Sequence, residues 1–212
     1  MPLAMTTELN AVNTILSAVG EPPVTTLDSQ TNADAAIAQN ILEEVNREVQ
    51  TMGWHFNTQH DVEFSPNSDN LIVLPDDVVR IDVDPRIKKA TEVGTVSSQT
   101  DNRDITQRGT ELFDRTNNTN QFTKSVKVTV VYLLEFTKLP EAARRYITVK
   151  ASRVFQDRMV GSQKHHAFSQ ADEIRALALM KEFEMDTADH TIFDNFDTMR
   201  IVNRGDAQRG IV

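Results

Sequence analysis

The sequence VGEPPV, residues 19–24, ends one helical pattern and separates it from a second one. Gly20 can take the left-handed conformation that closes a helix, and Pro22 and Pro23 cannot continue one, so the chain must turn here. Before this turn, apolar residues recur every three or four positions, as on one helix face: Leu9, Val12, Leu16 and Val19. The turn therefore predicts two separate N-terminal helices.

The second helical pattern begins shortly after the turn. Thr31 or Asn32 is a favourable N-cap, and Asp34 lies in the first turn, where the helix dipole favours an anion. The apolar spacing continues as far as Gly53, through Ile37, Ile41, Val45, Val49 and Met52. We expect these two helices to form an N-terminal pair over residues 6–54.

Residues 55–138 have a different pattern, of short apolar or alternating runs that are typical of β-strands. The clearest runs are LIVL at 71–74, VVRIDV at 78–83 and KVTVVYLLEF at 127–136. TQRGTELFDRT, at 106–116, predicts a strand that enters from a glycine turn, and the polar SSQTDNRD, at 97–104, predicts an exposed loop. A β-rich region is thus expected after the first helix pair.

Two further helices are predicted after the β-rich region, within residues 139–187. Pro140 suits the start of a helix that ends at Gly161, with an apolar face of Ala143, Ile147, Ala151 and Val154. A fourth helix is predicted from about His166 to Met185, with an apolar face of Ala167, Ala171, Ile174, Ala178 and Phe183.

Together these patterns predict an α+β fold, in which two helix pairs form a four-helix bundle and a β-rich domain is inserted between them. Neither pair alone can bury its apolar faces in water, so packing all four helices together is the simplest arrangement. Residues 188–212 lack clear periodicity and caps, which predicts an extended C-terminal arm. Its apolar residues need a surface to pack on, such as a neighbouring subunit: Ile192, Phe193, Phe196, Met199 and Ile201.

The composition argues against several classes of protein. The 212 residues include 31 acidic and 22 basic side chains, a formal net charge of -9, whereas proteins that grip duplex DNA need clustered Lys and Arg. There is no cysteine, which excludes disulfides and thiolate chemistry and fits synthesis in a reducing cytoplasm. No apolar run approaches the roughly 18 residues of a membrane helix, so we expect no membrane anchor.

No motif indicates a catalytic, cofactor or metal site, and we expect none of the three. The adjacent His165 and His166 diverge by about 100° on a helix and cannot share a metal as an i, i+4 pair would. Phosphate-binding, dinucleotide-binding and nucleophile-elbow glycine motifs are absent.

The third predicted helix is basic and the segment after it is acidic. Its arginines are the candidate residues for a subunit or partner interface: Arg144, Arg145, Arg153 and Arg158. One interpretation is ordinary surface ion pairing, worth under about 1 kcal/mol a pair. The other places the basic helix of one subunit against the acidic segment of the next, a head-to-tail contact that generates a ring.

Several stretches, taken in order, resemble one family of viral proteins. AVNTILSAVGEPPVTTL (11–27) and NADAAIAQNILEEVNREVQTMGWHFN (32–57) resemble the start of the tail tubular protein A family, the head-to-tail adaptor of T7-like short-tailed bacteriophages. The likeness continues through LIVLPDD (71–77), LFDRT (112–116), LPE (139–141) and VKASRVF (149–155).

The resemblance implies a non-enzymatic protein of the virion tail, made in the host cytoplasm. It implies a ring of about twelve copies between the portal protein and the nozzle of tail tubular protein B. The genome would pass through this ring without binding tightly, which suits an acidic chain. The alternative is a cell-wall hydrolase carried in the virion, although paired acidic residues such as Glu43 and Glu44 are adjacent and not placed across a cleft.

Overall fold

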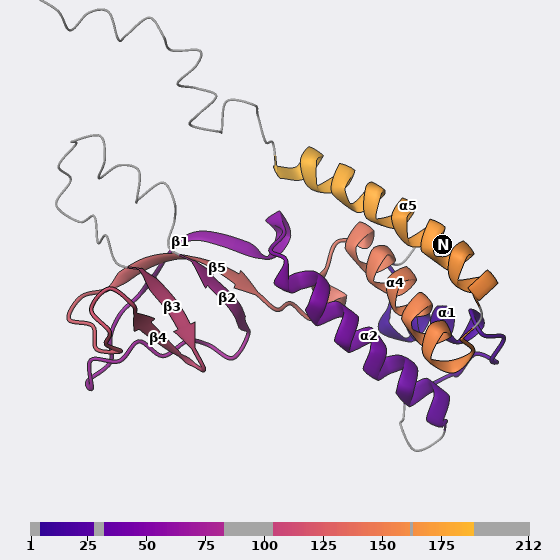
Figure 1. Ribbon diagram of the computed structural model, residues 1–212, viewed down its shortest axis with the longest axis horizontal. Helices are drawn as coiled ribbons and strands as arrows, with labels where there is room; N and C mark the ends of the chain where they lie inside the picture. Colours follow the sequence, from indigo (N-terminus) through magenta and orange to yellow (C-terminus); the bar gives the residue numbers. More distant parts are fainter. Residues whose placement is uncertain (1–4, 28–31, 83–103, 162, 189–212) are drawn as a thin grey trace, which may run out of the picture.

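Two groups of elements, one of helices and one of strands, lie side by side in the computed structural model (Figure 1). The structure describes residues 5–27, 32–82, 104–161 and 163–188. The helical lobe comes from both ends of this described chain and the β lobe from its middle. The predicted α+β class is confirmed, whereas the predicted arm, 188–212, lies beyond the described residues except for Ala188.

Four α-helices form the helical lobe: α1 (Glu8–Ser17), α2 (Ala33–Thr51), α4 (Glu141–Met159) and α5 (Gln163–Ala188). The first two begin at side-chain caps, since Thr7 accepts a hydrogen bond from the Asn10 amide and Asn32 accepts from the amides of Asp34 and Ala35. The prediction of Asn32 as a cap is therefore confirmed.

The VGEPPV segment forms a sharp corner after α1. Gly20 has a φ of 85°, and the Glu21 amide donates to the Leu16 carbonyl at 3.1 Å, as expected for a glycine that closes a helix. The Asn13 side chain then holds the returning chain through two hydrogen bonds to the backbone of Val24, at 2.8 and 3.0 Å. The corner is thus fastened to the helix that it follows.

Helix α4 lies at the centre of the helical lobe and contacts the other three helices. Its buried side chains, which include Ile147, Ala151 and Phe155, belong to one core with those of α1 and α2. Ile147 and Phe155 are fully buried, and each large apolar side chain buried in this way stabilises the fold by about 2 kcal/mol before ordering entropy. The expected apolar face of this helix is confirmed.

The apolar face that we expected on the fourth helix is wrong. Helix α5 packs on α4 through Ala176 and Met180, which are 6% and 1% exposed, whereas Ile174 is 62% exposed. Phe183 is 38% exposed, and Ala171 and Ala178 are also exposed. The helix carries apolar residues on more than one face, so spacing alone could not identify the packed one.

The β lobe contains a three-stranded antiparallel sheet in the order β1-β5-β2, formed by β1 (Thr58–Phe64), β5 (Val126–Tyr132) and β2 (Val78–Asp82). A two-stranded hairpin joins it, formed by β3 (Ile105–Arg108) and β4 (Glu111–Asp114). Gly109, with a φ of 63°, lies in the hairpin turn, so the predicted glycine turn is present between two strands.

A second, separate apolar core fills the β lobe, with Leu112, Phe122 and Val128 all fully buried. Strand β1 has an irregularity in its pairing with β5 where Asp61 takes a φ of 57°. The predicted strand LIVL is not a regular strand: Leu71 and Val73 form only isolated bridges, to Gln121 and Glu111. Its apolar pattern instead reflects burial of Ile72 and Leu74 in the β core.

Two short 3-10 helices connect the lobes: η1 (His55–Asn57) leads into the sheet and η2 (Phe136–Lys138) leads out of it. The run KVTVVYLLEF is therefore a strand only as far as Tyr132. In the described part of the chain, no helix has both the length and the apolar character needed to span a bilayer.

Candidate functional site

The two lobes meet at a joint that is built around one fully buried side chain, Gln50, near the end of α2. Its amide nitrogen donates to the Leu134 carbonyl at 2.8 Å, and its amide oxygen accepts from the Leu134 amide at 2.8 Å. The nitrogen also donates to the Asn46 side chain at 2.8 Å. Gln50 therefore ties α2 to the segment that leaves strand β5.

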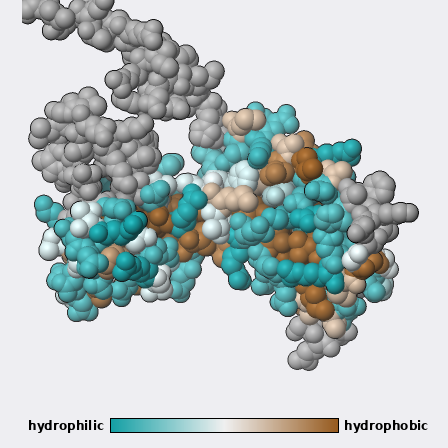
Figure 2. All heavy atoms as spheres, in the orientation of Figure 1, coloured by the Kyte–Doolittle hydropathy of each residue, from teal (hydrophilic) through white to brown (hydrophobic). Residues whose placement is uncertain are grey.

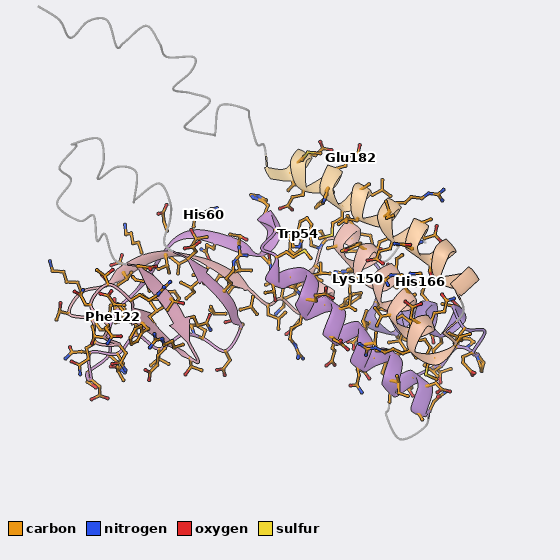
Figure 3. The ribbon with its side chains drawn as sticks, in the orientation of Figure 1. Trp54, His60, Phe122, Lys150, His166 and Glu182 are labelled. Carbon is orange, nitrogen blue, oxygen red and sulfur yellow. The ribbon has the colours of Figure 1, made fainter. Side chains whose placement is uncertain are left out.

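Trp54 and Asn57 extend this polar network along the start of η1. The Asn57 amide nitrogen donates to the carbonyls of Gln50 and Tyr132, both at 2.9 Å, and its oxygen accepts from the Trp54 amide at 2.8 Å. The Trp54 indole donates to the Val49 carbonyl at 2.7 Å. Figure 3 shows Trp54 where the two lobes meet. Every buried side-chain nitrogen and oxygen of this joint thus has a hydrogen-bond partner, as buried polar groups require.

Arg80, from strand β2, completes the joint on its exposed side. Its guanidinium donates to the carbonyls of Met52 and Thr51, at 3.2 and 3.4 Å, at the C-terminal end of α2. Helix carbonyls here are unpaired and carry the negative end of the helix dipole, so a cation is favourable. Gly53, with a φ of 79°, leaves room for this contact, because a Cβ there would lie 2.7 Å from an Arg80 nitrogen.

The first predicted interface residue, Arg144, is 4% exposed and is bound within the chain. Its guanidinium donates to the carbonyls of Leu139, Thr6 and Thr137, the first at 2.8 Å and the second at 2.7 Å. These contacts fasten the start of α4 to the segment before α1, more than 130 residues away. Arg144 thus organises the helical lobe.

Glu141 binds that same segment, by accepting hydrogen bonds from the Thr6 amide, at 3.0 Å, and from the Thr6 hydroxyl. Partial burial raises the pKa of the Glu141 carboxyl, but the two Thr6 hydrogen bonds and the charge of Arg144 outweigh it and hold the pKa below 4.5. The N-terminal segment is therefore bound to α4 by two charged side chains.

Arg153 and Arg158, also predicted at an interface, both form ion pairs within the chain. Arg153 pairs with Glu173 of α5 and, at 3.4 Å, with Asp157, and the Glu173 hydrogen bond raises the pKa of Arg153. Arg158 makes two hydrogen bonds of 2.9 Å to Glu44 of α2, which raise the pKa of Arg158 and lower that of Glu44.

Two further contacts join α4 to its neighbours. Lys150 binds Glu48 of α2 at 2.8 Å, and His166 of α5 lies 2.9 Å from Asp157 (Figure 3). Lys150, Arg153 and Arg158 of α4 therefore bind α2 and α5 of the same chain. Lys150, Arg153 and Glu173 are largely buried, whereas Arg158 and Glu44 are exposed, so of these pairs only the Arg158 pair is the ordinary surface ion pair of the first interpretation.

Arg145 is exposed, and among the described residues it forms no ion pair or side-chain hydrogen bond, unlike the other three arginines. The five apolar residues predicted at an interface, Ile192, Phe193, Phe196, Met199 and Ile201, lie outside the described residues. The assignment of these arginines and apolar residues to a subunit or partner interface stays a prediction.

Helix α5 has large apolar side chains that are exposed, and one of them, Ile174, was assigned to the packed face by the sequence analysis. Ile174, Leu179 and Met185 are 62%, 61% and 63% exposed. Figure 2 shows apolar surface along this helix, among hydrophilic neighbours. Sequence reasoning missed it because it assumed that Ile174 packs inward, although the helix has apolar residues on both sides.

A groove of about 300 Å³ lies between α2 and the segment that joins β5 to η2. Its floor is apolar, with Leu134 and Phe136, and its rim is charged, with Glu43, Arg47 and Glu135. No group of three or more metal-binding side chains exists in the described ranges, and Lys150, Arg153 and Arg158 are engaged in ion pairs within the chain.

Comparison with known proteins identifies one family. A family model described as tail tubular protein matches residues 9–190, which is most of the chain and includes both lobes. No curated protein matches the chain. The match covers the VGEPPV corner and the joint residues Gln50, Trp54 and Asn57.

Proposed function

Because the chain belongs to the tail tubular protein family, a family of structural proteins of the phage tail, we propose that it is the head-to-tail adaptor of a T7-like short-tailed phage. In this role about twelve copies form a ring that binds the portal protein on one side and the nozzle of tail tubular protein B on the other. The ring surrounds the channel through which the genome leaves the head. The role is structural, and no catalytic step is assigned to the chain.

The joint between the lobes is the observation that best supports this role. An adaptor transmits force between two partners, so its parts must keep a fixed orientation during assembly and ejection. Gln50 and Asn57 link α2 to strand β5 through buried hydrogen bonds, and Arg80 adds a link from strand β2. A buried network with every member paired favours one orientation, because any other leaves polar groups unsatisfied.

We assign different tasks to the parts of the chain. The helix pairs 6–54 and 139–187 form the wall of the ring, and the inserted region 55–138 reaches a neighbouring component. The arm 188–212 binds another subunit or partner through its apolar residues, and its order is coupled to that binding. Arg145, an exposed arginine of α4 that lies outside the ion pairs described above, is our first interface candidate among the predicted residues.

The acidic charge of the chain supports the proposed channel. In a ring, each exposed Lys or Arg of the bore is repeated in every copy, and roughly six to ten phosphate contacts already give strong adhesion to DNA. A net charge of -9 per copy instead favours passage without binding.

The proposal can be tested with phage particles that lack this protein. We expect heads that package DNA but carry no nozzle, and recovery of tail attachment when the purified chain is added. A chain without residues 188–212 should fold, as judged by circular dichroism, and fail to restore attachment. Complete tails in particles without the protein would contradict the adaptor role.

A further inference from the structure

Helix α5 has a second apolar side that faces away from the rest of the chain. Its inward side chains, Ala176 and Met180, pack against α4 and are nearly fully buried. On the opposite side, Ile174 and Met185 are each more than 60% exposed. Because successive helical residues are rotated by about 100°, these two residues share one face, and that face is turned from the core.

The outward residues form a continuous stripe that suits packing against another helix. The stripe follows a spacing of three and four, through Ala171, Ile174, Ala178, Lys181 and Met185, all of which are exposed. The small alanines leave gaps into which larger side chains of a facing helix fit. Lys181 can keep its ammonium group in water while its aliphatic part covers apolar surface. We call these five residues the α5 stripe.

The charged residues beside the α5 stripe match those of a second, antiparallel copy of the same helix. Arg175 and Glu182 are seven residues apart and therefore lie on the same edge of the stripe, and both are exposed (Figure 3 shows Glu182 on the outer side of α5). If two copies of α5 pack antiparallel, Arg175 of each copy lies near Glu182 of the other, so two ion pairs form. Parallel packing would instead bring each edge of the stripe against the opposite edge of the partner helix, so these two ion pairs would not form.

We infer that the α5 stripe binds the α5 stripe of a second copy of this chain in an antiparallel, two-fold contact. The charge arrangement is the reason to choose a second copy: one Arg and one Glu on the same edge form two ion pairs with an identical, inverted helix. The only described partner of Arg175 is a weak surface contact with Asp172, at 3.6 Å between side chains that are 79% and 66% exposed. Arg175 is therefore available to a second copy.

This contact goes beyond the proposed adaptor role and does not depend on it. A two-fold contact uses the same surface of both copies and therefore yields a dimer. A ring needs a head-to-tail contact between two different surfaces. The inference therefore concerns the free protein, whose apolar stripe would be covered before assembly. The stripe is about 21 Å long, so the contact is at the small end of protein interfaces and the dimer is expected to be weak and concentration-dependent.

Sedimentation equilibrium of the full chain over a wide concentration range tests the inference. We expect a monomer–dimer equilibrium in which Arg175→Glu or Glu182→Arg alone weakens the dimer at least about tenfold, because each variant places like charges at two positions. Both exchanges combined in one chain should restore the dimer. An equal mixture of the two single variants should also associate, since the mixed dimer regains both ion pairs.

Two control variants separate this contact from others. Ile174→Glu should weaken the dimer more than either charge variant, and Arg47→Glu, at an exposed arginine of the groove, should leave it unchanged. Circular dichroism and Trp54 fluorescence check that each variant is folded. A monomer at all concentrations, equal weakening by Arg47→Glu, or failure of the double exchange to rescue the dimer would each overturn the inference. None of these results would bear on portal binding.

Discussion

Replacing Gln50 by leucine should loosen the joint between the two lobes and destabilise the whole chain. Gln50 is fully buried, and the change removes three hydrogen bonds of 2.8 Å. The Leu134 amide and carbonyl, which are partly buried, then lose their partners. Each buried polar group left unpaired costs about 1 to 3 kcal/mol, so we expect a total loss of about 3 kcal/mol. For a chain of this size, this corresponds to a fall in Tm of about 6 to 12 °C.

The single tryptophan provides a direct assay, because Trp54 lies in this joint and is 9% exposed. In the Gln50→Leu variant, its emission should shift to longer wavelength at temperatures below the main unfolding transition, as the joint opens first. Asn40→Leu is the matched control, since Asn40 is an exposed amide on the same helix. Equal melting temperatures for the Gln50→Leu variant and the native chain would refute the account of the joint.

Other perturbations test the remaining contacts. Arg144→Met should lower the free energy of unfolding by about 3 kcal/mol, because three carbonyls lose a buried donor; a loss under 1 kcal/mol in urea unfolding would contradict this. Gly53→Ala should lower the free energy of unfolding by about 1 to 2 kcal/mol, since alanine disfavours a φ of 79° and its Cβ would displace Arg80. An unchanged midpoint of urea unfolding would contradict this reasoning. Glu141 has a lowered pKa, so its stabilising effect is present above the unfolded value of about 4.5 and is lost as pH falls through the folded value. The Tm, measured at several acidic pH values, should therefore fall less steeply with decreasing pH for Glu141→Gln than for the native chain. Equal falls in Tm for the two proteins would exclude this role of Glu141.

The sequence was most informative where one face of an element is buried. In α4 the spacing of Ala143, Ile147 and Ala151 identified the packed face correctly. In α5 the same reasoning was wrong, because Ile174 continues an apolar pattern that faces outward while Ala176 and Met180 pack inward. The spacing of apolar residues identifies the packed face of a helix only when the helix is apolar on one side. A helix that is apolar on two sides, such as α5, gives no single predicted packed face.

The joint could not be predicted because its bonds connect residues far apart in the chain. Gln50 and Leu134 are separated by 84 residues, and a glutamine within a helical pattern resembles any surface position. The arginines of α4 present the same difficulty. Their positive charge was visible in the sequence, but only the packing of α2 and α5 shows that Arg153 and Arg158 have partners in their own chain.

The central claim is that the chain assembles into an adaptor ring on the portal. The most direct test is the mass of the purified protein by light scattering, alone and after mixing with the portal protein of the same phage. We expect a small species alone, and with the portal a stable complex that contains a ring of about twelve copies. Failure to bind the portal at any salt concentration would contradict the adaptor role and would return other virion functions, including cell-wall hydrolysis, to consideration.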